Sequence, residues 1–130
     1  MYKIRIDADQ ALADVTLKGF LELHEVNDYI AELDVRFARV FSPGAPYVLL
    51  IDISECALQS TAVVDVFRDY IANFPKAERI AVVSGNSSAR MQVNRILARD
   101  YLRFFDFRAE ALSWLQELGL GKGPPKVMNA

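Results

Sequence analysis

The sequence predicts a single α/β domain with a mixed, mostly parallel sheet and the element order ββαβαβαβα. Three observations lead to this prediction. Two short runs at the start alternate apolar and polar residues, which is the period of a half-buried strand. A longer stretch then places apolar residues at steps of three and four, the period of a helix packed on one face. From Tyr47 onward, continuous apolar runs alternate with helix-period stretches, which is typical of right-handed βαβ crossovers.

The opening runs, residues 2–7 and 13–18, are separated by a short polar break and are predicted to form an antiparallel hairpin. The first helix follows and ends before Ser42-Pro43-Gly44, because proline cannot continue a helix. Its expected inner face consists of Leu23, Val26, Ile30, Leu33, Phe37 and Val40.

Residues 47–53 form a continuous apolar run, typical of a strand that is covered on both faces. Ser60 or Thr61 is expected to cap the second helix, which Pro75 ends. A second buried strand covers residues 80–83, and Ser87 or Ser88 is expected to cap the third helix.

A short strand at residues 101–105 precedes the last helix, which Asp106 is expected to cap and which runs through Leu118. An aromatic cluster is expected to build the core under this helix: Tyr101, Phe104, Phe105, Phe107 and Trp114. Residues 1–120 therefore form the predicted domain, and residues 121–130 are expected to be a flexible tail.

Composition restricts the classes of partner. The 130 residues are 52% hydrophobic with a net charge of −2, so neither nucleic acid nor an anionic membrane surface is expected to attract the protein. The lone Cys56 excludes an intrachain disulfide and a cysteine-based zinc cage. The N-terminus lacks the apolar segment of a signal peptide, and the longest apolar run is too short to span a bilayer. We expect a cytoplasmic protein without metal or cofactor.

No catalytic set stands out. The single histidine, His24, lies near the start of the first helix beside two glutamates, as a surface histidine would. Cys56 is expected to pack as a small apolar residue, so a catalytic pair of His24 and Cys56 is not expected.

Asp52 follows a buried strand, at the end of the sheet where open α/β proteins bind ligands. Asp52 and Ser54 are candidates for binding a ligand, and an enzyme would use Asp52 or Glu55 with Ser54. The alternative is that Asp52 accepts hydrogen bonds from the amides of its own loop.

A glycine turn at Gly85 opens the third helix and leaves free amides with the helix dipole behind them. An anion would fit there, with Arg90 as its countercharge. The candidate anion-binding residues are Gly85, Asn86, Ser87, Ser88 and Arg90. The alternative is a structural turn followed by a cap.

The chain resembles the STAS domains of anti-sigma-factor antagonists, and within them the SpoIIAA-like branch grouped with SEC14-type lipid-binding folds. The similarity is carried by residues 47–54 (YVLLIDIS), residues 79–85 (RIAVVSG), and the closing FFD and EALSWL segments at 104–106 and 110–115. It extends over residues 2–118 and implies a STAS-like fold.

Antagonist STAS domains carry an Asp-Ser-Ser/Thr-Gly turn before the second helix, whose hydroxyl a partner kinase phosphorylates. This chain has Gln59-Ser60-Thr61-Ala62 there, without the acidic residue and the glycine. The resemblance therefore implies Ser60 and Thr61 as candidate sites of phosphorylation or partner docking, matched by position. Phosphate at a helix N-terminus is electrostatically tolerated.

Three functions are considered. The first is a non-enzymatic interaction or regulatory module that binds a protein partner, with a homodimer as one arrangement. The second is a binder of a lipid or another small apolar or anionic ligand between helices and sheet. The third is an enzyme that uses Asp52 or Glu55 with Ser54. The resemblance and the lack of a catalytic set favour the first.

Overall fold

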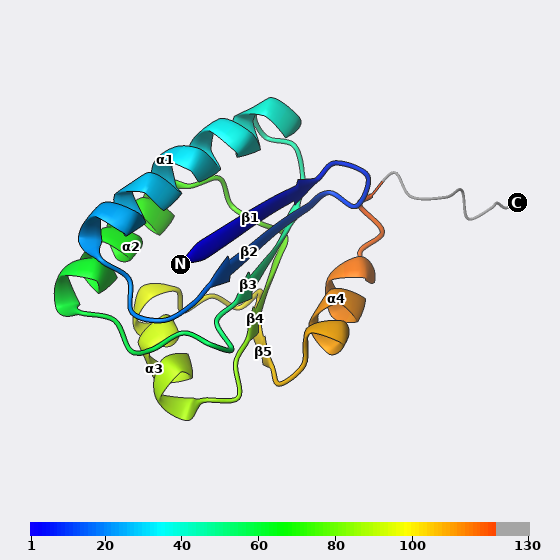
Figure 1. Cartoon of the computed structure of the whole chain (residues 1–130). Helices are drawn as coiled ribbons and strands as arrows, with labels where there is room; N and C mark the ends of the chain where they lie inside the picture. The colour runs from blue at the N-terminus through cyan, green and yellow to red at the C-terminus, as the bar shows by residue number, and fades with distance from the viewer. Residues whose placement is uncertain (122–130) are drawn as a thin grey trace, which may run out of the picture.

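The computed structural model describes residues 1–121 as one five-stranded sheet with helices on both faces (Figure 1). The strands are β1 (Tyr2–Asp7), β2 (Leu12–Leu17), β3 (Val48–Asp52), β4 (Arg79–Val83) and β5 (Leu102–Phe105). The helices are α1 (Leu23–Val40), α2 (Thr61–Asn73), α3 (Ser87–Ile96) and α4 (Arg108–Gln116). The predicted order ββαβαβαβα is confirmed.

The strands lie side by side in the order β1-β2-β3-β4-β5. β1 is antiparallel to β2, and each later pair is parallel, so the sheet is mixed and mostly parallel as predicted. Each parallel connection carries a helix, because a crossover between parallel strands needs a long link.

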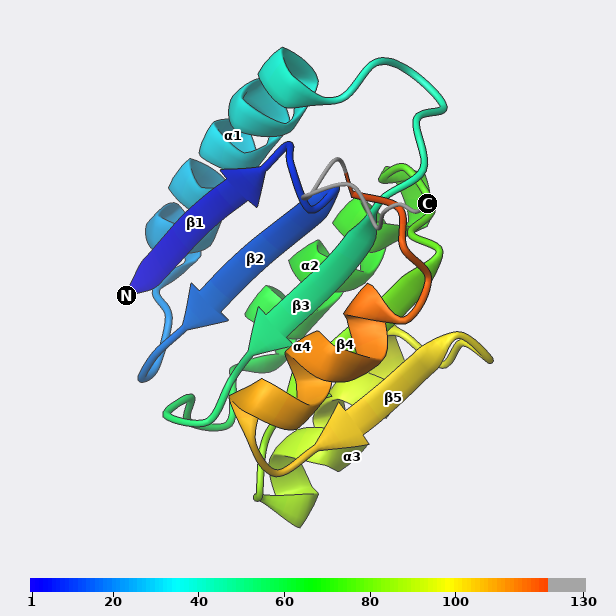
Figure 2. The same ribbon diagram turned by 90° about the vertical axis from the view of Figure 1, so that its right-hand side faces the viewer.

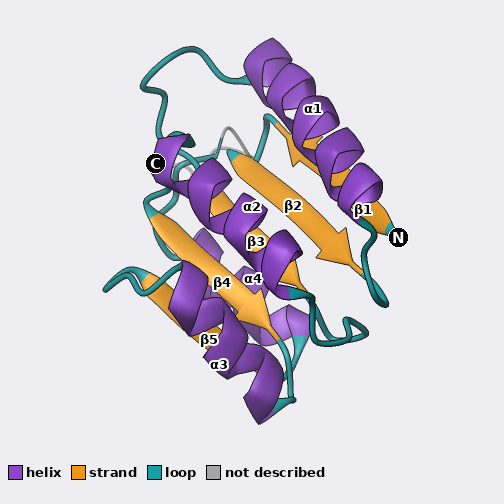
Figure 3. Ribbon diagram, turned by 90° about the vertical axis from the view of Figure 1, so that its left-hand side faces the viewer, coloured by secondary structure: helices purple, strands orange, loops and turns teal. Residues whose placement is uncertain are grey.

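The helices are divided unequally between the two faces. α1, α2 and α3 cover one face, with α2 between the other two (Figure 3). α4 alone packs on the opposite face, where it contacts β4, β3 and β5 (Figure 2). β1 and most of β2 therefore have no helix over them on the α4 side.

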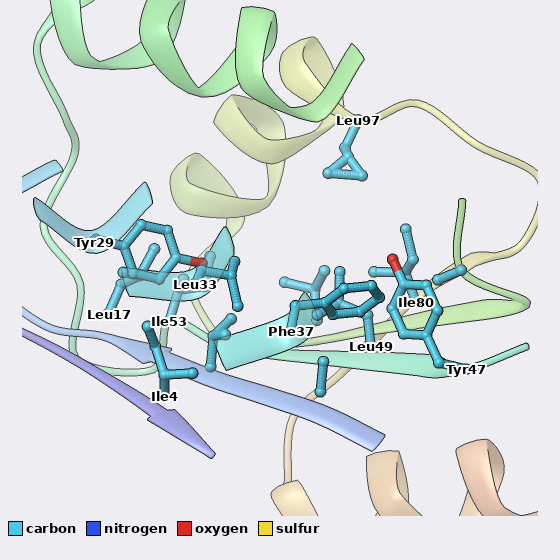
Figure 4. Packing of buried hydrophobic residues seen from close by; sticks show 14 of the residues in the cluster. Ile4, Leu17, Tyr29, Leu33, Phe37, Tyr47, Leu49, Ile53, Ile80 and Leu97 are labelled. Carbon is cyan, nitrogen blue, oxygen red and sulfur yellow. The ribbon is translucent and has the colours of Figure 1, made fainter. Parts of the chain in front are cut away.

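The larger core lies between the sheet and α1–α3. Tyr29, Leu33 and Phe37 of α1 point down onto sheet residues such as Ile4 and Leu49 (Figure 4). A smaller core lies under α4, where Ala111 and Leu115 pack on apolar side chains of β2, β3 and β4. Burial of both cores is the main stabilising contribution to the fold.

Some details of the helices differ from the predictions, and α4 ends at Gln116 rather than at Leu118. Tyr29, not Ile30, is buried on α1, and Leu23 and Val40 are exposed. These two are the first and last residues of α1, where a side chain has packing neighbours on one side only. Asp106 does not cap α4; its carboxylate accepts a hydrogen bond from Arg90 instead.

The predicted aromatic cluster is split between the two faces. Consecutive strand residues point to opposite faces, so Phe104 packs against the larger core while Phe105 contacts Trp114 of α4. Phe107 lies outside both cores and is exposed.

Between residues 1 and 121, no helix combines the length and the apolar character needed to cross a membrane. Apart from Gly121, the segment predicted to be a flexible tail lies outside the described residues.

Candidate functional site

Two loops at the carboxyl ends of β2 and β3 are joined by backbone hydrogen bonds. The amide of Gly19 donates to the carbonyl of Glu55 at 2.9 Å, and the amide of Ala57 donates to the carbonyl of Gly19 at 3.1 Å. Gly19 and Cys56 consequently form an isolated parallel bridge. Gly19 has a φ of +70°, a conformation that glycine adopts without steric cost.

Gln59 links these loops further. Its side-chain carbonyl accepts from the amide of Leu21 at 2.9 Å, and its side-chain amide donates to the carbonyl of Gly19 at 3.0 Å. The backbone of Gln59 is in turn paired with the side chain of Gln92 on α3, at 3.0 and 3.1 Å. The β2–α1 loop, the β3–α2 loop and α3 are thus held together; we call this region the loop edge.

Three large apolar side chains at the loop edge are exposed. Phe20, Leu58 and Met91 keep 56%, 53% and 59% of their surface in contact with solvent. Each is the sequence neighbour of a residue in the hydrogen-bond network just described. We call these three residues the loop-edge patch. Aromatic and methionine side chains are enriched in protein-binding surfaces relative to the rest of a protein surface.

Ser60 and Thr61 lie at the same edge, at the start of α2. Ser60 is the N-cap, and its hydroxyl oxygen accepts from the amide of Val63 at 3.2 Å. Thr61 is the first helical residue and is exposed. The hydroxyl of Ser60 therefore caps the helix, whereas Thr61 is exposed and its hydroxyl makes no hydrogen bond with residues 1–121.

Asp52 and Ser54 contact each other directly. One carboxylate oxygen of Asp52 accepts from both the amide, at 3.0 Å, and the hydroxyl of Ser54. The other oxygen lies 3.5 Å from Nη1 of Arg108. Asp52 therefore stabilises its own loop by accepting hydrogen bonds from Ser54, and it also contacts the start of α4.

The Gly85 turn is arranged as a cap. Asn86, not Ser87 or Ser88, is the N-cap of α3, and its side-chain oxygen accepts from the amide of Ala89 at 3.0 Å. Asn serves as well as Ser at this position, and it lies one residue earlier. Arg90 donates to the carbonyl of Ser84 at 2.7 Å and to Asp106 at 2.8 Å, so it crosslinks this turn to the β5–α4 loop. Anion binding here stays a prediction.

A half-open hollow of about 330 Å³ lies on the α4 side of the sheet, and we call it the polar hollow. It brings Asp52 and Ser54 together with residues that sequence reasoning missed. Its lining residues are Lys3, Arg5, Asp14, Thr16, Lys18, Asp52, Ser54, Glu55 and Arg108. The alternation of β1 and β2 had indicated a polar face, but nothing in the pattern separates a solvent-covered face from a site beside a helix.

An apolar cavity of about 100 Å³ lies between the sheet and α1–α3. Apolar side chains of β2, β3 and all three helices make up nearly all of its wall, among them Val15, Ile51, Phe67, Ile71 and Val93. Cys56 lines it as well, and burial raises the pKa of its thiol.

The groups with the greatest catalytic potential do not meet. His24 is exposed on α1, and the thiol of Cys56 bonds with Gly19 and Gln59. Within the described residues, no three histidine, cysteine, aspartate or glutamate side chains are grouped so as to hold a metal ion.

Neither a family model nor a curated protein matches the sequence. Several solved structures are similar to it, among them the following two. An uncharacterised protein of the DUF3478 family from Shewanella loihica PV-4, with a SpoIIAA-like fold, has 22% identity and a TM-score of 0.66, over 88% of this chain and 93% of its own. An anti-sigma factor antagonist from Mycobacterium paratuberculosis has 12% identity and a TM-score of 0.62, over 89% of this chain and 95% of its own. The resemblance predicted from the sequence is confirmed at the level of the fold: the chain has the SpoIIAA-like fold that it shares with an anti-sigma factor antagonist.

Proposed function

We propose that this protein is a non-enzymatic, regulatory interaction module that binds a protein partner through the loop edge. The observation that carries the proposal is the loop-edge patch: Phe20, Leu58 and Met91 are exposed on segments fixed to one another by Gln59 and Gln92. A surface fixed before binding loses little conformational entropy on association. The fold shared with an anti-sigma factor antagonist supports a regulatory role.

Ser60 and Thr61 give this surface a means of regulation. Thr61 is exposed at the start of α2, where phosphate would meet the positive end of the helix dipole. A phosphate there would add negative charge to the loop edge and change its affinity for the partner. Of the two hydroxyls, we assign the switch to Thr61, since phosphorylation of Ser60 would displace an existing cap.

The proposal is tested by comparing Leu58→Asp with Val35→Asp. Val35 is 51% exposed on α1, so the same charge is added to a surface that the proposal leaves free. Tagged variants are expressed in the native cells, and the proteins that co-purify are quantified. We expect Leu58→Asp to lower recovery of the partner at least about tenfold, as loss of a central interface residue does. Equal recovery with both variants would contradict the proposal.

The partner can be a second copy of the chain. Light scattering of the purified protein separates this case from a different partner, because a homodimer has twice the monomer mass. A dimer that Leu58→Asp dissociates and Val35→Asp leaves intact agrees with the proposal. A dimer that both variants leave intact places the interface elsewhere.

The apolar cavity favours a second candidate function, the binding of a small apolar ligand between the helices and the sheet. A cavity of about 100 Å³ whose wall is almost entirely apolar is a place where an apolar group is favoured over water. Native mass spectrometry of gently purified protein should then show added mass. Consistently unliganded protein from several preparations would contradict this second function.

A further inference from the structure

We propose that the polar hollow binds a small phosphate-bearing molecule. The site lies on the α4 side of the sheet, beside the amino end of α4 and over the part of β1 and β2 that no helix covers (Figure 2). It is separate from the loop-edge patch, and none of Phe20, Leu58 and Met91 lines it.

The floor of the hollow contains a buried carboxylate. Asp14 of β2 is only 4% exposed, although the neighbouring side chains on this face of β1 and β2, among them Lys3, Arg5 and Thr16, are polar. Arg5 of β1 donates to it from Nε at 3.3 Å and from Nη2 at 3.1 Å, and Arg108 of α4 donates to it from Nη2. One buried carboxylate thus fixes two guanidinium groups that come from opposite sides.

This arrangement is costly as a purely structural device. Removing a carboxylate from water is costly unless its partners compensate, and apolar side chains often stabilise such a place equally well. α4 already packs on an apolar core through Ala111 and Leu115. The charged cluster is better explained as a means of holding the two guanidinium groups in fixed positions.

The two guanidinium groups of the hollow are more exposed than the carboxylates of Asp14 and Asp52. Asp14 and Asp52 are bonded to Arg5, Arg108 and Ser54, and Arg5 also forms a salt bridge with Asp7 at 3.2 Å, while both guanidinium groups remain partly exposed. Glu55 is the exposed acid, and it lies 3.6 Å from Lys18. Lys3 forms no salt bridge with any residue between 1 and 121. The lining of the hollow thus carries four cations and three carboxylates, a net charge of +1, whereas the whole chain has a net charge of −2.

The donors suit phosphate. Guanidinium groups offer paired N–H donors that match two phosphate oxygens, and fixed groups lose less entropy on binding. Thr16 and Ser54 add hydroxyls to the wall, and α4 brings its positive end to the site. A volume of about 330 Å³ accommodates a small metabolite.

Binding of inorganic pyrophosphate, followed by calorimetry and by amide NMR shifts, tests the proposal. We expect a Kd of about 1 mM or tighter, with shifts concentrated at Lys3, Arg5, Thr16 and Arg108. Citrate, a carboxylate anion of similar charge, is expected to bind at least about tenfold more weakly, since each planar carboxylate offers two acceptor oxygens where a phosphate group offers three.

Lys3→Ala is the decisive variant, because Lys3 has no salt-bridge partner and its loss leaves the fold intact. We expect it to weaken pyrophosphate binding about tenfold, the effect of one charge-assisted contact. Arg39→Ala is the matched control: it also removes one exposed cation, from the last turn of α1, and should leave binding unchanged. Arg108→Lys retains the charge but not the paired donors, and should weaken binding while circular dichroism remains unchanged.

Three results would overturn the proposal. They are the absence of pyrophosphate binding, equal weakening by Lys3→Ala and Arg39→Ala, and binding of citrate as tight as that of pyrophosphate. Equal weakening by the two variants would mean that binding depends only on the net charge of the protein. Equally tight binding of citrate would mean that the hollow does not select phosphate.

Discussion

Gln59 and Gln92 exchange a pair of hydrogen bonds that joins the loop before α2 to the side of α3. The amide of Gln59 donates to the side-chain oxygen of Gln92 at 3.0 Å, and the side-chain nitrogen of Gln92 donates back to the carbonyl of Gln59 at 3.1 Å. Because the side chain of Gln59 bonds with Gly19 and Leu21, this one pair connects all three segments of the loop edge. The loop-edge patch is therefore carried on a coupled frame.

The first prediction concerns that coupling. Gln59→Ala and Gln92→Ala should each lower the free energy of unfolding by about 1 kcal/mol, because each leaves backbone groups without a partner. The double variant should lose less than the sum, with an interaction energy of about 0.5 kcal/mol or more. Hydrogen exchange at the amide of Leu21 should accelerate in Gln59→Ala, since that amide donates to Gln59.

Gln116→Ala is the control for this pair. Gln116 bonds with Gln10 at an exposed position away from the loop edge, so its loss should leave the exchange of Leu21 unchanged. Strictly additive effects of the two loop-edge substitutions would mean that the segments are not coupled.

The second prediction separates the two hydroxyls at the start of α2. Ser60→Ala should lower the free energy of unfolding by about 1 kcal/mol, because it removes the N-cap that the amide of Val63 uses. Thr61→Ala should be neutral or slightly stabilising, since alanine has the higher helix propensity. Thermal or urea denaturation measures both, and a larger loss for Thr61→Ala would contradict the described cap.

The third prediction concerns Tyr70, which donates from its hydroxyl to Asp34 of α1 at 2.7 Å. Burial, and then this hydrogen bond, raise the pKa of Tyr70, and burial raises the pKa of Tyr29 as well. The unfolded chain releases these phenolic protons above about pH 10, while the folded chain retains them. Their contribution to stability is therefore complete below pH 10 or so and is lost as the pH rises further.

Tyr70→Phe should reduce this alkaline loss and cost about 1 kcal/mol at neutral pH. Stability is measured by urea denaturation across the alkaline range. Tyr101→Phe is the control, because among residues 1–121 the hydroxyl of Tyr101 has no hydrogen-bond partner. Identical pH profiles for wild type and Tyr70→Phe would contradict the prediction.

The fourth prediction concerns Cys56. Burial raises the pKa of its thiol, and the thiolate is the reactive form. Alkylation by iodoacetamide should therefore be slower than that of a free cysteine at neutral pH, and its rate should rise only at higher pH. A ligand in the apolar cavity should slow it further, because Cys56 lines that cavity. A rate equal to that of free cysteine would show that the thiol is not buried.

The fold was predictable because its signals are local. Alternation in β1 and β2, the apolar run of β3 and the helix-period stretches each depend on neighbouring residues, so ββαβαβαβα and the mixed sheet followed directly. Ser60 as a cap also lies within its own turn. Asn86 replaced the serines as the cap of α3 because three adjacent residues were all suitable.

The sites depend on contacts between distant parts of the chain, and these leave no local signal. Arg108 and Asp14 are 94 positions apart, and Gln59 and Gln92 are 33 apart. No periodic pattern in the sequence predicts that these side chains are in contact. In the sequence, Asp14 alternates with apolar residues as a surface aspartate would. Its ion pairs with Arg5 and Arg108 form only in the folded chain, so the pattern does not predict its burial.

Site-specific photo-crosslinking tests the central claim, binding of a partner at the loop edge, most directly. A photoreactive amino acid is placed at Leu58 or, as a control, at Val35, and the native cells are irradiated. We predict a discrete crosslinked protein from position 58 that is absent from position 35 and diminished when Phe20→Asp is added. Crosslinks of equal yield from both positions, or none from position 58, would contradict the claim.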